Sequence, residues 1–353
     1  MIGRMSAPSP ELAPPATPRW RRRWVRLVVV GVIVVALSVI GLRGRLPAPQ
    51  DILGALAGAN YGWILLAAVL QAVSIEAFAL QQRRLLNSLG AHLTRGHIMA
   101  ITLAGTALSI SMPAGPAVST AFTIREYQRG GATREASAAS AIVSGLASIG
   151  GLGLLFAGGG LALLTRTSDD LLTWRPLAVV AGMTAVTVAA ILVGRRLARR
   201  PATTGPVKDA GNQVTRTLQS VLRAGRDAWR AGAELRAGDW VFALVYATVK
   251  WLTDLLCLVA VAEALHLPVG VAAMAGIYLS VQVVRQVPLT PGGVGVVETA
   301  LVAGLTTAGA TVAGATAAVL TYRVLSTWIL IPIGGIAAVA LRRERDRSAP
   351  PAT

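Results

Sequence analysis

Residues that could do chemistry gather in one glycine-rich run near the C-terminus. The run consists of Pro288, Leu289, Thr290, Pro291, Gly292, Gly293, Val294, Gly295, Val296, Val297 and Glu298. Its glycines let the backbone turn tightly and approach a ligand closely. Glu298 places an acid in an apolar part of the chain, where a charge is costly and usually functional. A nucleotide site is not expected, because the run lacks a P-loop lysine and a preceding soluble strand.

Two further charged residues lie inside apolar stretches. Arg323 falls within 313–340 and Glu76 within 60–80. A buried guanidinium needs an anionic partner, either a carboxylate or a phosphate. We predict that Arg323 pairs with Glu298. An alternative role for Glu298 is to cap the short helix that follows the glycines, where a carboxylate complements the helix dipole.

Lys250 and Asp254 stand four residues apart in the apolar stretch 239–263 and therefore share one helix face. They either form an ion pair that only offsets their burial, or form a coupled proton or headgroup site. Arg285, close to the glycine run, either binds a phosphate or anchors the helix at the membrane interface, and Arg125 with Glu126 has the same two interpretations. The predicted substrate-binding residues are Lys250, Asp254, Arg285, Pro291, Gly292, Gly293, Gly295, Glu298 and Arg323.

Catalytic and metal chemistry have little support in the sequence. Cys257 is the only cysteine, and His92, His97 and His266 are scattered. We find no nucleophile beside a base and no cluster with metal-ligand spacing, so we expect neither an enzyme nor a cofactor.

These residues must be positioned by membrane helices. Hydrophobic residues form 54% of the chain and charged residues 14%, whereas soluble domains carry roughly 25% charge. The sequence predicts an all-α integral membrane protein of about eight spans, because its apolar stretches suit the roughly 17 to 25 residues that cross a bilayer. The predicted spans are 25–42, 60–80, 97–112, 134–164, 176–194, 239–263, 270–287 and 313–340. The glycines of 134–164 are expected to allow close helix packing.

Arginine accounts for almost all of the net charge of +17. The arginines cluster at span ends and in the loop 195–238, which favours anionic lipid headgroups over nucleic acid as partners. Cytoplasmic loops are enriched in basic residues, so we predict a bacterial plasma-membrane protein with both termini cytoplasmic. Segments 1–18 and 342–353 would be tails around a membrane domain, 19–341. The loops 43–59, 165–175 and 264–269 would lie outside.

The basic loop has two interpretations. Its part 212–236 fits an amphipathic helix on the anionic inner leaflet, and the alternative is a solvated charged linker.

Two proline–glycine clusters interrupt the spans. They lie at 113–116 and 288–295, and each predicts a helix break followed by a half-helix, at 117–127 and 294–309. The clusters align at an offset of 178, so that Pro113 matches Pro291, Gly115 matches Gly293 and Gly131 matches Gly309. The predicted topology makes this a possible inverted repeat, which in transporters places the site at the broken helices.

The chain resembles the transmembrane, flippase-like domain family associated with lysylphosphatidylglycerol synthases. The residues that carry the resemblance are Trp251, Asp254, the run 288–298, Tyr322, Arg323, Gly334 and Gly335. The resemblance implies a domain that translocates or handles an anionic or polyprenyl-linked lipid. The residues that match the family's motif are the glycine run, Glu298 and Arg323.

Two departures qualify this resemblance. Members often carry an acid and an arginine in the helix after the first break, where this chain has Ser144 and Gly145. We also expect the soluble aminoacyl-transferring domain of the full synthases to be absent, and with it lysyl transfer. The leading hypothesis is a lipid translocator. The alternative is a non-transporting membrane partner of an envelope-lipid enzyme that docks through the loop 195–238.

Overall fold

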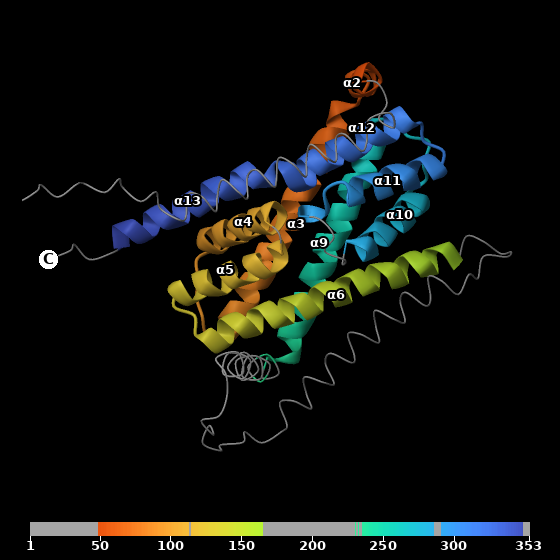
Figure 1. The fold of residues 1–353 in the computed structure, drawn as a ribbon. Coiled ribbons are helices and arrows are strands. Elements are labelled where there is room, and N and C mark those ends of the chain that lie inside the picture. The colour runs from red at the N-terminus through yellow and green to blue at the C-terminus, as the bar shows by residue number, and fades with distance from the viewer. Residues whose placement is uncertain are drawn as a thin grey trace, which may run out of the picture. The chain divides into compact units, whose positions relative to one another are not determined.

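A computed structural model describes residues 49–112, 114–164, 230, 232, 235–285 and 291–348. Its elements in these ranges are all helices (Figure 1). They are α2 (Pro49–Ala57), α3 (Tyr61–Ser88), α4 (Arg95–Ser111), α5 (Gly115–Arg129), α6 (Arg134–Leu164), α9 (Ala237–Ala264), α10 (Val271–Val284), η1 (Pro291–Gly293), α11 (Val296–Thr307), α12 (Val312–Arg323), η2 (Val324–Trp328) and α13 (Leu330–Ser348).

Four of the described helices are long and apolar enough to cross a membrane. They are Tyr61–Ser88, Arg134–Gly158, Ala237–Ala264 and Val312–Glu344. Their outward-facing residues are apolar too, with Leu65 68% and Ile336 72% exposed, as expected where lipid replaces water. The predicted spans 25–42 and 176–194, the tail 1–18 and most of the loop 195–238 lie outside the described residues. The count of eight spans therefore stays a prediction.

Four segments differ from their predicted bounds, and one of them is the last span, which continues beyond 340 to Ser348. The segment 43–59, predicted as a plain loop, contains the short helix α2, which begins with Pro49, a residue whose fixed φ suits a first helical turn. The second span continues beyond 80 to Ser88. The apolar stretch 270–287 was predicted as a full span, but α10 has 14 residues. At 1.5 Å per residue it is about 21 Å long, which is short of a crossing.

Each predicted break joins two short helices that pack side by side, α4 with α5 and α10 with α11 (Figure 1). The first turn needs glycine, because a Cβ on Gly115 would lie 1.9 Å from the carbonyl oxygen of Ser109. Pro113 itself lies outside the described residues. The half-helices are confirmed as α5 and α11, each packed against the helix before its break in a helical hairpin. Residues 286–290 of the second hairpin also lie outside the described residues.

The tips of the two hairpins meet. Gly292, in the second break, lies so close to the last turn of α4 that a Cβ on it would be 3.0 Å from the carbonyl oxygen of Ile110. The two breaks, which are 178 residues apart in the sequence, thus lie against each other in the fold.

The turns that follow the hairpins also correspond at the offset of 178. Ala132 donates to the carbonyl of Tyr127 and Ala310 to that of Leu305, each at 3.0 Å. Thr133 and Thr311 then each accept an amide through the side-chain oxygen at 3.1 Å. The same type of turn recurs at Gly90 and His266, because it is a common way to end a helix. The possible repeat stays a prediction, and its support is the whole pattern of break, short helix and turn rather than the turn alone.

Helix α9 lies at the centre of the described bundle and packs against α3, α6, α10 and α12. Small residues bring the backbones close. A Cβ on Gly151 of α6 would lie 2.8 Å from the amide nitrogen of Thr248, so this glycine permits the contact of α6 with α9. By contrast, Gly145 and Gly153 face open space. The predicted packing role of the α6 glycines therefore holds for only some of them.

Candidate functional site

The predicted pair of Arg323 and Glu298 is confirmed. The Arg323 Nε donates to Glu298 Oε1 at 2.6 Å, and its Nη2 donates to the carbonyl oxygen of Gly292 at 3.2 Å. Arg323 is 1% exposed, whereas the Glu298 side chain is 17% exposed. The guanidinium is thus held between the acid and the tip of the second hairpin.

Glu298 also caps helix α11. Its Oε2 accepts a hydrogen bond of 2.6 Å from the backbone amide of Gly295, three residues earlier. Gly295 has a φ of 88°, a conformation that glycine adopts easily. The two roles considered for Glu298, pairing and capping, are therefore met at once, one by each carboxylate oxygen.

Gly292 and Gly293 form a tight turn beside Arg323. Gly292 and Gly293 have φ values of 61° and 69°. A Cβ on Gly293 would lie 2.8 Å from Val297 Cγ2. Pro291 opens the short turn η1. Larger residues would strain this turn and push the Gly292 carbonyl away from the arginine.

The helix that carries Arg323 changes its winding directly after it. A π-helical turn, Val324–Trp328, follows α12 and precedes α13. Such turns are rare and are often found at functional sites. It separates the Arg323 end of the helix from the half that packs against α4.

Asp254 forms a second buried cluster beside the pair. Its Oδ2 accepts hydrogen bonds from the hydroxyls of Tyr278 at 2.6 Å and Tyr322 at 3.1 Å. The cluster ties α9 to α10 and α12, and Tyr322 is the sequence neighbour of Arg323. Sequence reasoning missed Tyr278, although a tyrosine inside an apolar stretch signals a buried hydroxyl that needs a partner.

The proposed ion pair of Lys250 with Asp254 is wrong, since the two side chains do not come within ion-pairing distance. The Lys250 Nζ lies over the ring of Trp251 at 3.6 Å and over that of Phe78 at 5.6 Å. A shared helix face allows a pair but does not require one. Asp254 turns to the tyrosines of α10 and α12, while Lys250 turns towards α3, where aromatic faces stabilise its charge.

Arg285 sits at the C-terminal end of α10, exposed to the surroundings. It lies next to the glycine run, because its Cγ is 3.8 Å from the place of a Cβ on Gly293. It forms no ion pair with any acid in the described part of the chain. The choice between a phosphate ligand and an interfacial anchor stays open at this point.

Two other acids singled out in the sequence, Glu76 and Glu126, have partners of their own. Glu76 accepts from Arg95 Nε at 2.7 Å and is therefore not a partner of Arg323. Glu126 pairs with Arg129 rather than acting together with Arg125, which is exposed.

The first prediction concerns the Asp254 cluster. Tyr322→Phe removes one of the two donors to the buried carboxylate and should lower the stability of the protein in detergent by roughly 1–3 kcal/mol. Thermal unfolding of the purified chain measures the loss. Tyr246→Phe is the control, because the Tyr246 hydroxyl makes no hydrogen bond within the described residues. Equal stability of the two variants would contradict the role given to Asp254.

Comparison with known proteins identifies the family of this chain. The chain matches a protein family described as the lysylphosphatidylglycerol synthase TM region over residues 23–334. No curated protein matches it. The match covers the described hairpins, the Asp254 cluster and the pair of Arg323 and Glu298. This chain therefore belongs to the family of the lysylphosphatidylglycerol synthase TM region and is a multi-pass membrane protein.

Proposed function

We propose that this chain translocates a lipid with an anionic headgroup, a class that includes polyprenyl-linked phospholipids, across the bacterial plasma membrane. The observation that carries the proposal is the buried pair of Arg323 and Glu298 at the meeting point of two helical hairpins. An uncompensated charge in this place would be strongly destabilising. The arginine therefore needs an anion at every stage, and either an acid or a phosphate can serve.

An arginine suits an exchange of anions. Its planar guanidinium binds carboxylate and phosphate with similar geometry, often through two parallel hydrogen bonds. When a lipid phosphate replaces Glu298 on Arg323, the carboxylate keeps its bond to the Gly295 amide and the positive end of the α11 helix. Departure of the lipid restores the pair. The site is then reset without a cofactor and without a covalent step.

The hairpins supply the movement in this proposal. If the repeat is inverted, the two hairpins approach the site from opposite sides of the membrane, and rocking of one half against the other exposes it alternately to each side. Arg285 would guide the headgroup towards Arg323. The lipid tails would stay in the bilayer throughout.

A transport assay tests the proposed site. Purified protein is reconstituted into vesicles with labelled phosphatidylglycerol, and the rate of flipping is measured for Glu298→Gln and for Arg323→Ala. Each should be slowed about tenfold or more, which corresponds to about 1.4 kcal/mol of lost stabilisation. The control is Arg95→Ala, which breaks an arginine–glutamate pair on the exposed surface. Unchanged flipping by both site variants would refute the site.

The same assay separates the alternative of a non-transporting partner protein. In that case the basic loop 195–238 would dock an envelope-lipid enzyme, and the purified chain would not flip lipid at all. A translocator should keep its activity in vesicles when the loop is shortened.

A further inference from the structure

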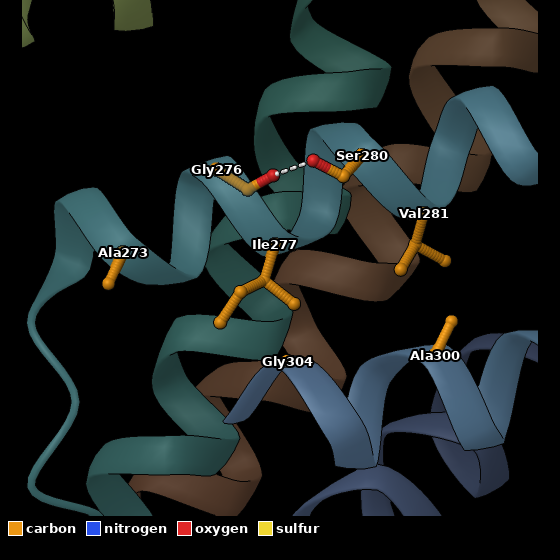
Figure 2. A pocket seen from close by; sticks show the side chains of 7 residues that line it. All are labelled: Ala273, Gly276, Ile277, Ser280, Val281, Ala300 and Gly304. Atoms are coloured by element: carbon orange, nitrogen blue, oxygen red, sulfur yellow. Dashed lines mark hydrogen bonds between the residues drawn. The ribbon is translucent and has the colours of Figure 1, made fainter. Parts of the chain in front are cut away.

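An open groove runs between the two helices of the second hairpin. It has a volume of about 430 Å³, within the roughly 300 to 1,000 Å³ of ligand clefts. Figure 2 shows Ala273, Gly276 and Val281 on α10 above Ala300 and Gly304 on α11. Small side chains on both walls keep the space open.

The floor of the groove is closed by direct packing of the two helices. Ile277 points from α10 onto Gly304 of α11 (Figure 2), where a Cβ would lie 2.6 Å from its Cγ2. Gly276, on the rim, has no atom within 4 Å of the place of a Cβ. The groove is therefore closed at its floor and open on one side.

The lining offers no free hydrogen-bonding group. Its one hydroxyl, that of Ser280, donates to the carbonyl oxygen of Gly276 at 2.8 Å, drawn as a dashed line in Figure 2. All other lining side chains are apolar. Hydrocarbon is the ligand that such a surface accepts without loss of hydrogen bonds.

The groove runs along the hairpin in the direction of its break (Figure 2). Ala273 and Gly304 mark its far end, and Val281 and Ala300 its near end. Ala300 stands two residues after Glu298, and Arg285 stands one helical turn after Val281. Arg285 is exposed and unpaired among the described residues, so a cation lies about one helical turn beyond the Val281 end of the groove.

We propose that the groove between α10 and α11 seats an acyl or prenyl chain of the transported lipid while Arg285 binds its phosphate. The inference rests on the proposed function and adds where the hydrocarbon tail of the lipid binds. Charge complementarity selects the occupant, since an apolar groove with an unpaired arginine one helical turn beyond its end fits a lipid with an anionic headgroup. The tail then follows the headgroup along the hairpin during transport.

Photolabelling of the full chain tests the seat. Vesicles carry phosphatidylglycerol with a diazirine on one acyl chain, and labelled peptides are identified by mass spectrometry after irradiation. The label is expected in 273–281 and 300–304. Gly276→Leu, whose side chain enters open space, should reduce it about tenfold by displacing several methylene groups. Gly145→Leu, at an equally open glycine of α6, should leave it unchanged.

The role of Arg285 is tested with a neutral probe. Diacylglycerol carrying the same diazirine chain should label the groove more weakly than phosphatidylglycerol, and Arg285→Gln should remove the difference. Equal labelling by the two probes in the unaltered protein would overturn the phosphate contact.

Other occupants of the groove give different results. If a second copy or a helix of the same chain fills it, the lipid probe does not label it and Gly276→Leu changes nothing. A second copy would also give disulfide-linked dimers of Ser280→Cys in a Cys257→Ala background. Either result overturns the lipid seat. A third outcome separates the two proposals. If the probe labels the groove but Arg323→Ala does not slow flipping, the translocation site is refuted and the lipid seat is kept.

Discussion

The Arg323→Gln variant is expected to lose roughly 2–4 kcal/mol of stability, because it leaves the partly buried Glu298 carboxylate without its cation. The Arg323 side chain is 1% exposed, and its hydrogen bonds to Glu298 and Gly292 both go to the second hairpin. The loss should appear as a lower midpoint of thermal unfolding in detergent. Flipping of labelled phosphatidylglycerol should stop.

The double variant Arg323→Gln with Glu298→Gln separates structure from function. It removes both charges, and the new amide oxygen can still accept from the Gly295 amide. Replacing a buried ion pair as a whole is often close to neutral, so most of the stability should return. Flipping should not, because no cation remains to receive the phosphate. A double variant that flips lipid normally would show that the pair only supports the fold.

The control for this loss of stability is an ion pair that contributes little to the free energy of unfolding. Arg95→Gln breaks the contact to Glu76, in which the arginine side chain is 64% exposed. Exposed pairs contribute about 0–1 kcal/mol. A loss as large as that of Arg323→Gln would mean that burial does not determine the effect.

Hydrophobic length and helix breakers made most of the described fold predictable. The ends predicted for the spans 97–112 and 134–164 agree with α4 and α6 to within two residues. The pair of Arg323 and Glu298 was also predictable, because each charge lies in an apolar stretch and neither could stay unpaired there. A buried arginine requires an anionic partner, and few acids lie in the apolar stretches.

The pairing of Lys250 could not be predicted in the same way. Spacing of four residues places Lys250 and Asp254 on one face, but α9 has neighbours on several sides and each charge found a different one. Tyrosine hydroxyls and aromatic rings served as partners, and neither carries a formal charge that a search for ion pairs would find. Tertiary contacts decided the outcome.

The reversal of the chain at the breaks was likewise not evident from the sequence. Proline and glycine indicate where a helix ends, but the direction in which the next helix leaves depends on packing. At Gly115 the backbone contact with Ser109 folds α5 back along α4. The meeting of Gly292 with Ile110 joins two segments far apart in the chain, and only the folded structure brings them together.

Gly334→Ala is expected to be strongly destabilising, whereas Gly335→Ala is not. A Cβ on Gly334 would lie 2.3 Å from the carbonyl oxygen of Leu103 and 2.5 Å from the Cβ of Ala107, both on α4. Backbone atoms cannot turn aside as side chains can, so α13 has to move away from α4. Overpacking of this kind costs about 1–3 kcal/mol or more. Thermal unfolding of the purified variants measures the difference.

Gly335 is the matched control, since it is adjacent, helical and without any atom within 4 Å of a Cβ. Alanine there should be neutral or stabilising by up to about 1 kcal/mol through helix propensity. The contact of α13 with α4 also holds the first hairpin in place, as His97 meets Glu344 at 3.3 Å farther along the same two helices. Gly334→Ala should therefore shift Ile110 away from Gly292 and slow lipid flipping, while Gly335→Ala keeps the rate. Equal effects of the two substitutions would contradict the packing of α13 on α4 and, with it, the joining of the two hairpin tips into one site.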